Sequence, residues 1–212
     1  MDLKRQLAAV MFTDIEGFTA LMQTDESAAI AGRDKYVAVL ERYHGAFGGE
    51  IVQFFGDGSL SRFANSVDAV DCAVAIQRDL RADPEVPVRI GIHVGNVMVE
   101  PTGLIGDAVN IASRIESFGL HGTVLISDSV EDQVRNQAGL SLVDLGKFKL
   151  KNVGRPFTIF AVDAPGLRVP AHDFLQGKGE KLASLPSNLP ERSVPLLGRE
   201  TVINELAALL HQ

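Results

Sequence analysis

Asp14 is the residue of this chain whose position most directly suggests chemistry. It closes the apolar, β-prone run Ala8–Thr13, and a turn containing Gly17 leads from it into helical sequence. The pattern predicts a strand that delivers a carboxylate to its own end, beside the N–H groups that open a helix and attract phosphate. A carboxylate next to a bound phosphate requires a cation between them, and Mg²⁺ is the natural candidate. An Asp at such a junction is also an ordinary helix N-cap, and for Asp14 alone the cap is favoured.

Asp57 is a second carboxylate with a matching position. It stands between Gly56 and Gly58, in a turn that joins the β-prone runs 50–55 and 59–63, and this pattern predicts a hairpin. If the hairpin lies beside the first strand, both carboxylates reach the same edge of the sheet. Two carboxylates on rigid strand ends can hold two divalent ions, which clamp the attacking and leaving oxygens of a phosphoryl transfer. Taken alone, Asp57 is better explained as an ordinary Asp-Gly turn residue.

Asn110 and Arg114 form a third candidate group. They are four residues apart in the predicted helix 107–118 and therefore share one face. An amide beside a guanidinium suits a sugar oxygen and a phosphate, because Arg is a planar and permanently charged donor. A solvated helix face is the alternative.

The elements that must position these residues alternate between strands and helices. Hairpins interrupt the alternation, so the sheet should be mixed rather than purely parallel. A return strand is expected to begin within 96–99. Asp107 is the expected N-cap of the helix predicted over 107–118. Helices are predicted over 25–47, 67–80 and 107–118 and from Ser127, and the remaining strands over 88–94, 123–126, 141–149 and 157–162.

Composition and charge exclude several classes of protein. With 46% hydrophobic and 22% charged residues, the chain is typical of a globular protein. A net charge of −7 argues against general binding to nucleic acid or to an anionic membrane, which requires clustered Lys and Arg. There is no apolar run of bilayer length and no signal-peptide core, and the single Cys72, expected to be a buried hydrophobe, excludes an internal disulfide. We expect a cytoplasmic protein without a membrane or nucleic-acid partner.

Four segments, in this order, resemble the catalytic domain of bacterial-type class III nucleotide cyclases, the adenylate and guanylate cyclases. They are Phe12–Thr19, Phe55–Gly58, Arg89–Gly95 and Gly106–Arg114, and the resemblance covers about residues 6–163. It implies an α+β fold with a ferredoxin-like core, in which a mixed, mainly antiparallel sheet is flanked by helices. It also implies a head-to-tail homodimer with sites at the interface.

The resemblance assigns roles to the residues around the first carboxylate. Asp14 and Asp57 would bind two Mg²⁺ or Mn²⁺ ions per site, helped by the carbonyl of Ile15. Backbone amides of the following loop would cradle the outer phosphates of the nucleotide. The loop residues concerned are Gly17, Phe18 and Thr19.

Other residues would come from the opposite subunit. By the resemblance, Asn110 would position the ribose and Arg114 would stabilise charge at the α-phosphate. Lys151 matches the basic residue that holds the terminal phosphates, with Lys149 as a substitute because the spacing there is loose. The implied reaction is attack of the ribose 3′-hydroxyl on the α-phosphorus with loss of pyrophosphate.

Base recognition is where the chain departs from the family pattern. Adenine-specific members usually have Lys where this chain has Gln53, and Asp or Thr where it has Gly103, with Thr102 available if the loop shifts by one residue. Guanine-specific members usually have Glu and Cys at these places. The Gln amide can donate or accept, so it can satisfy either purine. We therefore predict weak base selection, with ATP as the main substrate and GTP as a second one.

Three regions are predicted along the chain. Residues 1–164 form the cyclase domain, 165–192 a Pro- and Gly-rich linker, and 193–212 a segment that resembles the start of a signalling ATPase domain, without its phosphate-binding loop. A C-terminal helix that packs on the cyclase is the alternative for the last region. For the whole, the alternative to a purine nucleotide cyclase is a catalytically weak homology module that dimerises and binds nucleotide to regulate an attached ATPase.

Overall fold

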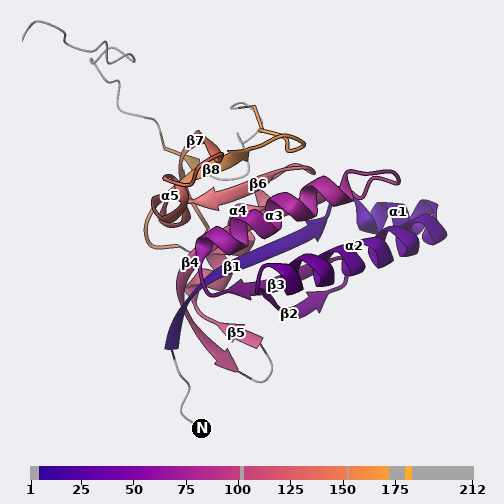
Figure 1. Ribbon diagram of the computed structural model, residues 1–212, viewed down its shortest axis with the longest axis horizontal. Helices are drawn as coiled ribbons and strands as arrows, with labels where there is room; N and C mark the ends of the chain where they lie inside the picture. Colours follow the sequence, from indigo (N-terminus) through magenta and orange to yellow (C-terminus); the bar gives the residue numbers. More distant parts are fainter. Residues whose placement is uncertain (1–4, 101–102, 152, 172–179, 183–212) are drawn as a thin grey trace, which may run out of the picture.

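A single mixed sheet organises the protein. The computed structural model describes residues 5–100, 103–151, 153–171 and 180–182. Within these residues the strand order is β2-β3-β1-β4-β6-β8-β7-β9, and β5 pairs with the outer end of β4 (Figure 1). The pair β4–β6 is parallel and the other described pairs are antiparallel. The strands are β1 (Arg5–Ile15), β2 (Glu50–Phe55), β3 (Gly58–Phe63), β4 (Val88–Glu100), β5 (Gly103–Ile105), β6 (Val124–Ser127), β7 (Ser141–Lys149), β8 (Phe157–Asp163) and β9 (Glu180–Lys181).

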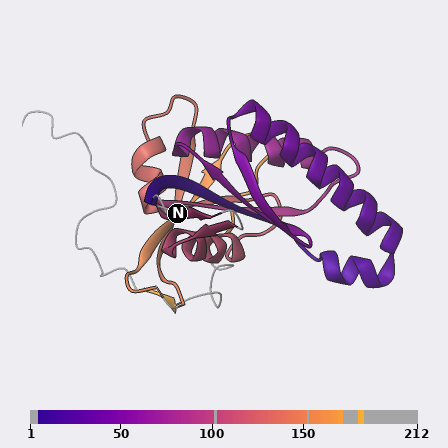
Figure 2. The ribbon, with the colours of Figure 1, turned by 90° about the horizontal axis from the view of Figure 1, so that it is seen from below.

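Helices cover both faces of the sheet, which confirms the predicted α+β fold. One face carries α2, α3 and α5, and the opposite face carries α4, as the view from below shows (Figure 2). The short α1 precedes α2 and extends with it beyond the end of the sheet (Figure 1). The helices are α1 (Phe18–Thr24), α2 (Glu26–Ala46), α3 (Ser66–Leu80), α4 (Asp107–Ser117) and α5 (Asp128–Val134).

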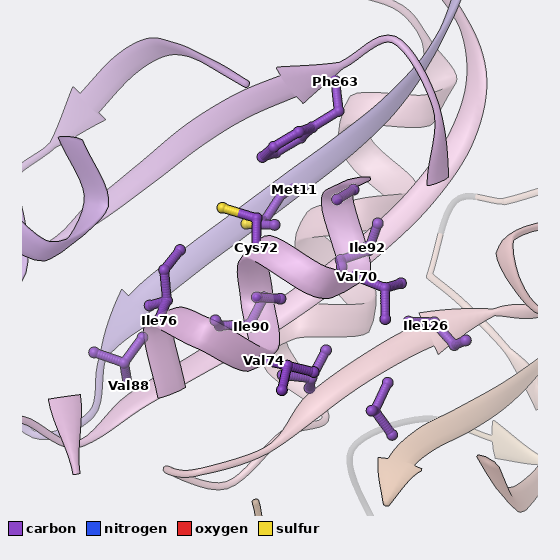
Figure 3. Packing of buried hydrophobic residues seen from close by; sticks show 14 of the residues in the cluster. Met11, Phe63, Val70, Cys72, Val74, Ile76, Val88, Ile90, Ile92 and Ile126 are labelled. Carbon is purple, nitrogen blue, oxygen red and sulfur yellow. The ribbon is translucent and has the colours of Figure 1, made fainter. Parts of the chain in front are cut away.

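Strand β1 is buried on both faces. Helices cover both sides of the sheet, and neighbouring side chains of a strand point to opposite sides. Ala9 and Met11 face the main core under α3, whereas Ala8 and Val10 pack toward α4. Figure 3 shows Met11 close to Cys72 of α3 in the main core. Cys72 is fully buried, as predicted, and burial raises the pKa of its thiol to about 12. The central strand is therefore held rigidly on both sides.

Two local predictions are wrong. Strand β4 does not turn back at 96–99 but continues to Glu100, because its outer half pairs with the beginning of β1, where Met98 lies opposite Arg5. The N-cap of α4 is Gly106 rather than Asp107. A Cβ on Gly106 would lie 2.7 Å from the carbonyl oxygen of Asn96, so the close approach of the two backbones selects glycine there.

The other predicted elements agree with the structure to within one or two residues, except that β1 begins at Arg5, three residues before the predicted run. The hairpin of β2 and β3 forms around Asp57, and Asp25 caps α2 through the N–H of Ala28 at 3.0 Å. Strands β5 and β9 were not predicted; β5 pairs with β4 and the two-residue β9 pairs with β7. No helix among the described residues has both the length and the apolar character needed to cross a bilayer.

Candidate functional site

The end of β1 and the β2–β3 turn bring together the residues predicted to bind metal. Asp14 lies opposite Gly58 in the β1–β3 ladder, and the N–H of Ile15 donates to the carbonyl of Asp57 at 3.1 Å. A Cβ built on Gly58 would lie 3.4 Å from Oδ1 of Asp14, which places that oxygen beside the hairpin. Both carboxyl-bearing residues thus reach the same edge of the sheet, as the metal prediction requires.

The alternative that Asp14 caps a helix does not apply. The N-cap of α1 is Gly17, at φ 76°, and no side chain accepts a hydrogen bond there. Asp57 does occupy a tight turn, so its position serves the hairpin as well as the candidate site. The role of Asp14 must therefore come from something other than capping.

Arg89 is the immediate partner of Asp14, and sequence reasoning gave it no role. The two residues lie opposite each other in the β1–β4 ladder, and the guanidinium pairs with the Asp14 carboxylate. Its Nε lies 2.9 Å from Oε1 of Glu116, near the end of α4. The signal that could have identified Arg89 is the antiparallel register, because a residue opposite a functional carboxylate is a natural counter-ion.

Asp14 has one positively charged neighbour, Arg89, and two negatively charged ones, Asp57 and Glu16. Burial raises its pKa above the ordinary value, and this effect outweighs the hydrogen bond and charge of Arg89, which lower it. Repulsion from Asp57 and Glu16 raises the pKa further. A half-buried carboxylate that neighbouring carboxylates repel gains stability from a cation.

The donor set is small but suited to a hard cation. In the described part of the chain, no three His, Cys, Asp or Glu side chains gather as a metal-binding cluster. Asp14, Asp57 and the Ile15 carbonyl together offer only oxygen ligands, which Mg²⁺ prefers, and Mg²⁺ commonly takes its remaining ligands from water and substrate phosphates. The residues therefore fit a cation that arrives with a phosphorylated substrate.

The predicted phosphate loop follows immediately. Gly17 adopts the left-handed backbone conformation in which side-chain-bearing residues are strained, and it leads into α1 at Phe18. Thr19 is exposed and Phe18 is half-buried against the main core. Burial is the largest effect on the Glu16 carboxyl and raises its pKa. The hydrogen bonds that Glu16 accepts from His121, together with the charge of Arg89, outweigh burial and lower the pKa.

Asn110 and Arg114 lie on the outer surface of α4 and are exposed. Asn110 lines a cavity of about 390 Å³ together with Val153, Gly154 and Arg155. Among the described residues, no hydrogen bond or ion pair connects either side chain to Asp14 or Asp57. Within the described residues of one chain, the predicted ribose and α-phosphate ligands therefore make no direct polar contact with the predicted metal ligands.

Lys151 is also remote from the metal ligands of its own chain. It follows β7, which is four strand positions from β1 in the sheet. At about 4.8 Å per position, the two strands are about 19 Å apart. Lys151 is exposed in the turn before β8, so within one chain it lies on a strand far from Asp14 in the sheet order.

The two residues predicted to read the base lie side by side. A Cβ built on Gly103 would lie 3.8 Å from Oε1 of Gln53, which is exposed on β2. Gly103 has φ +151°, a conformation that disfavours other residues. Thr102, the predicted substitute, lies outside the described residues.

The fold and these residues define a nucleotide cyclase catalytic domain. The chain belongs to this family: residues 60–163 match the profile described as "Adenylate and Guanylate cyclase catalytic domain". The crystal structure of the adenylyl cyclase CyaB from P. aeruginosa superimposes with a TM-score of 0.71 at 26% identity, over 77% of this chain and 96% of that one. The adenylate/guanylate cyclase/hydrolase from Silicibacter pomeroyi gives a TM-score of 0.66 at 30% identity, over 76% and 98%.

Sequence relatives agree with this assignment. The protein named "Putative adenylate cyclase 3" from Rhizobium meliloti is 37% identical over 166 residues, which are 74% of this chain. The adenylate cyclase of Anabaena cylindrica is 30% identical over 188 residues, 73% of this chain. The matched regions span only 28% and 36% of the lengths of these relatives.

Proposed function

We propose that the chain converts a purine nucleoside triphosphate, chiefly ATP, into its 3′,5′-cyclic monophosphate and pyrophosphate at a homodimer interface, with weak base selection. The observation that carries the proposal is the meeting of Asp14, Ile15 and Asp57 at one edge of the sheet. The names of the Rhizobium and Anabaena relatives support ATP as the substrate and cyclic AMP as the product.

Asp14 and Asp57 would hold Mg²⁺ or Mn²⁺, with the carbonyl of Ile15 as a further ligand. When bound, a pair of such ions supplies positive charge at the attacking and leaving oxygens of a phosphoryl transfer. The fit rests on the oxygen donor set and on the repulsion from Asp57 and Glu16 that raises the pKa of Asp14. Arg89 keeps Asp14 aligned at the end of β1.

The remaining residues bind and orient the nucleotide. The amides of Gly17, Phe18 and Thr19 would bind its outer phosphates at the start of α1. From the other subunit, Asn110 would orient the ribose, so that the 3′-hydroxyl oxygen attacks the α-phosphorus in line. Its proton passes to water or to the departing pyrophosphate, and the bond to the pyrophosphate oxygen breaks. Arg114 would stabilise the charge that develops on the α-phosphoryl oxygens, and no protein nucleophile is needed.

The homodimer is proposed because, among the described residues, the predicted nucleotide ligands make no direct polar contact with the metal ligands of their own chain. Asn110 and Arg114 are exposed on α4, and Lys151 lies four strand positions from Asp14. A two-fold arrangement would make these outer residues complete the partner's metal site, giving two equivalent sites per dimer.

Weak base selection rests on Gln53 and Gly103. The Gln53 amide can meet either purine edge after a flip, and Gly103 adds no side chain beside it. A site without a dedicated donor or acceptor rejects the wrong base weakly, because rejection relies on hydrogen bonds left unmade. We expect ATP and GTP to be turned over within about tenfold of each other, and Gln53→Lys to increase the preference for ATP. Strong ATP preference that Gln53→Lys leaves unchanged would contradict this reading.

The direct test is product identification by mass spectrometry from a mixture of nucleoside triphosphates with Mn²⁺. We expect cyclic purine nucleotides from the wild type and none from Asp57→Ala. Asp132→Ala is the matched control, since Asp132 is an exposed acidic residue on α5, and it should retain full activity. Equal background product from the wild type and Asp57→Ala would instead favour the alternative, a nucleotide-binding module without turnover.

Mixing two inactive variants tests the shared site. Asp57→Ala lacks the metal half, whereas Asn110→Ala lacks the ribose half. In random heterodimers one of the two sites is intact, so an equal mixture should recover about a quarter of wild-type activity. Activity that stays at the level of the single variants would contradict a site shared between subunits.

A further inference from the structure

A hydrogen-bonded chain connects the phosphate loop with the segment that follows the last long strand of the cyclase fold. Its first member is Glu16, between the candidate metal ligands and Gly17. The carboxylate oxygen Oε2 of Glu16 accepts two hydrogen bonds from His121, from the backbone N–H at 3.0 Å and from Nδ1 at 2.7 Å. The N–H of Glu16 donates to the carbonyl of Pro87 at 2.7 Å, so backbone and side chain are both fixed.

His121 is the second member, and its ring has a defined protonation pattern. Arg168 contacts Nε2 of His121 through its Nη1. Because a guanidinium only donates, Nε2 must accept, and the ring proton is then on Nδ1, where it is donated to Glu16. The ring is therefore neutral and is held from both sides, with about two thirds of both the Glu16 and the His121 side chains buried.

Arg168 is the third member, and its own backbone is anchored. Its N–H donates to the carbonyl of Gly122 at 2.8 Å, and its Cγ would lie 3.2 Å from a Cβ on Gly122, which has φ +80°. The N–H of Gly122 donates in turn to the carbonyl of Val88 at 2.9 Å. The loop that carries His121 is thus fastened to β4 on one side and to Arg168 on the other.

The segment 164–171 is docked on the end of α3. Arg78 donates to the carbonyl of Pro165 at 3.0 Å, and Arg81 donates to that of Gly166 at 2.9 Å. Leu167 packs against the main core, and its N–H closes a turn onto the carbonyl of Ala164 at 3.0 Å. Arg168 therefore extends from a fixed platform and not from a loose tail.

We propose that Glu16, His121 and Arg168 are positioning residues for the phosphate loop, so that segment 164–171 forms part of the nucleotide site. The ligand is the triphosphate group of the substrate. This inference rests on the proposed function, since it gives the loop a phosphate to bind. Loss of the Glu16 or the Arg168 side chain would leave the Gly17–Thr19 amides less well oriented, without removing any group that touches the nucleotide.

Binding of inorganic tripolyphosphate with Mg²⁺, measured by calorimetry on the full chain, tests the positioning role without chemistry. We expect about tenfold weaker binding in Glu16→Ala, which loses two hydrogen bonds to a carboxylate, and about threefold weaker binding in Arg168→Ala. Glu16→Gln keeps an acceptor oxygen and should stay within about twofold. Arg42→Ala is the matched control, because Arg42 is an exposed arginine that pairs with Asp79, and it should bind as the wild type does.

Two further measurements separate positioning from a merely structural role. In the active enzyme, the same variants should raise KM for ATP more than they lower kcat, with unfolding midpoints near that of Arg42→Ala. Nitrogen NMR of the imidazoles, with the His121 signals assigned by their loss in His121→Asn, should show a neutral ring protonated at Nδ1. A doubly protonated ring, a proton on Nε2, or tripolyphosphate binding that is absent or insensitive to Glu16→Ala and Arg168→Ala would overturn the inference.

The outcomes also distinguish this inference from the proposed function. Suppose that the wild type makes no cyclic nucleotide, while Glu16→Ala and Arg168→Ala bind tripolyphosphate more weakly than it does. That result would refute the cyclase function and support the positioning role of these residues. If the wild type is an active cyclase, but neither substitution changes KM or tripolyphosphate affinity, the cyclase function is supported and the positioning role is refuted.

Discussion

Acid should destabilise the fold through His93, a histidine of β4 that is only 5% exposed. Its Nδ1 lies 2.7 Å from the hydroxyl of Ser127, and its ring meets that of Phe157 edge-on at 5.4 Å. Burial lowers the pKa of His93 to about 4, the charge of Arg155 lowers it too, and Asp128 opposes both. The ordinary value in an unfolded chain is about 6.5.

The sign and the size follow from these two pKa values. Below about pH 6.5 the unfolded chain binds a proton at His93 that the folded chain does not, so stability falls as the pH falls toward 4. A difference of about 2.5 pKa units corresponds to about 3 kcal/mol, and most of it, about 2.5 kcal/mol, should be lost between pH 7 and 4.5. Below pH 4 both states are protonated and the loss is complete.

Urea unfolding at a series of pH values measures this loss. His93→Gln removes the titration, so the difference in unfolding free energy between wild type and variant should change by about 2.5 kcal/mol between pH 7 and 4.5. Ser127→Ala is the control: it removes the hydrogen bond but leaves His93 buried, and should keep the wild-type pH dependence. If the difference between wild type and His93→Gln is independent of pH, the buried neutral histidine is not the cause.

Three further predictions concern packing. Gly91→Ala should destabilise the fold by about 3 kcal/mol in urea unfolding, because the new Cβ would lie 2.2 Å from the backbone N of Glu116 on α4. Gly45→Ala, in helix α2 with no atom within 4 Å of the new Cβ, should stabilise it by about 0.5–1 kcal/mol, and a loss instead would contradict the open environment. Cys72 should resist alkylation in the folded protein and react only in denaturant, as mass spectrometry would show, because its thiol is buried and its pKa is about 12.

Local patterns predicted the elements that carry the candidate site. The run before Asp14 and the Asp-Gly turn at Asp57 determine a strand and a hairpin within short windows, and both form. The Asn110 and Arg114 spacing predicted that they share one face of a helix, and both lie exposed on α4. Each of these features depends on contacts between residues near in sequence, and such contacts are the ones that periodicity and turn chemistry encode.

Long-range partners could not be predicted in this way. Arg89 lies 75 residues from Asp14, and His121 lies 105 residues from Glu16. Only the strand register and the path of the α4–β6 loop bring these side chains together. The misplaced cap at Asp107 has a similar cause, because the preference for Gly106 comes from a neighbouring strand and not from the helix itself.

Specific contacts hold the candidate metal ligand and the phosphate loop in place. Asp14 is held by Arg89 and the central strand, and Glu16 by the loop of His121. The predicted nucleotide ligands Asn110 and Lys151 lie on other surfaces of the same chain, on α4 and after β7. If the two groups meet only across a dimer interface, each must be preorganised before its partner arrives, because misplacement by about 1 Å costs around a hundredfold in rate. Hydrogen bonds that link the phosphate loop to segment 164–171 would preorganise the loop beside the metal ligands. A movement of segment 164–171 would then change the rate of catalysis.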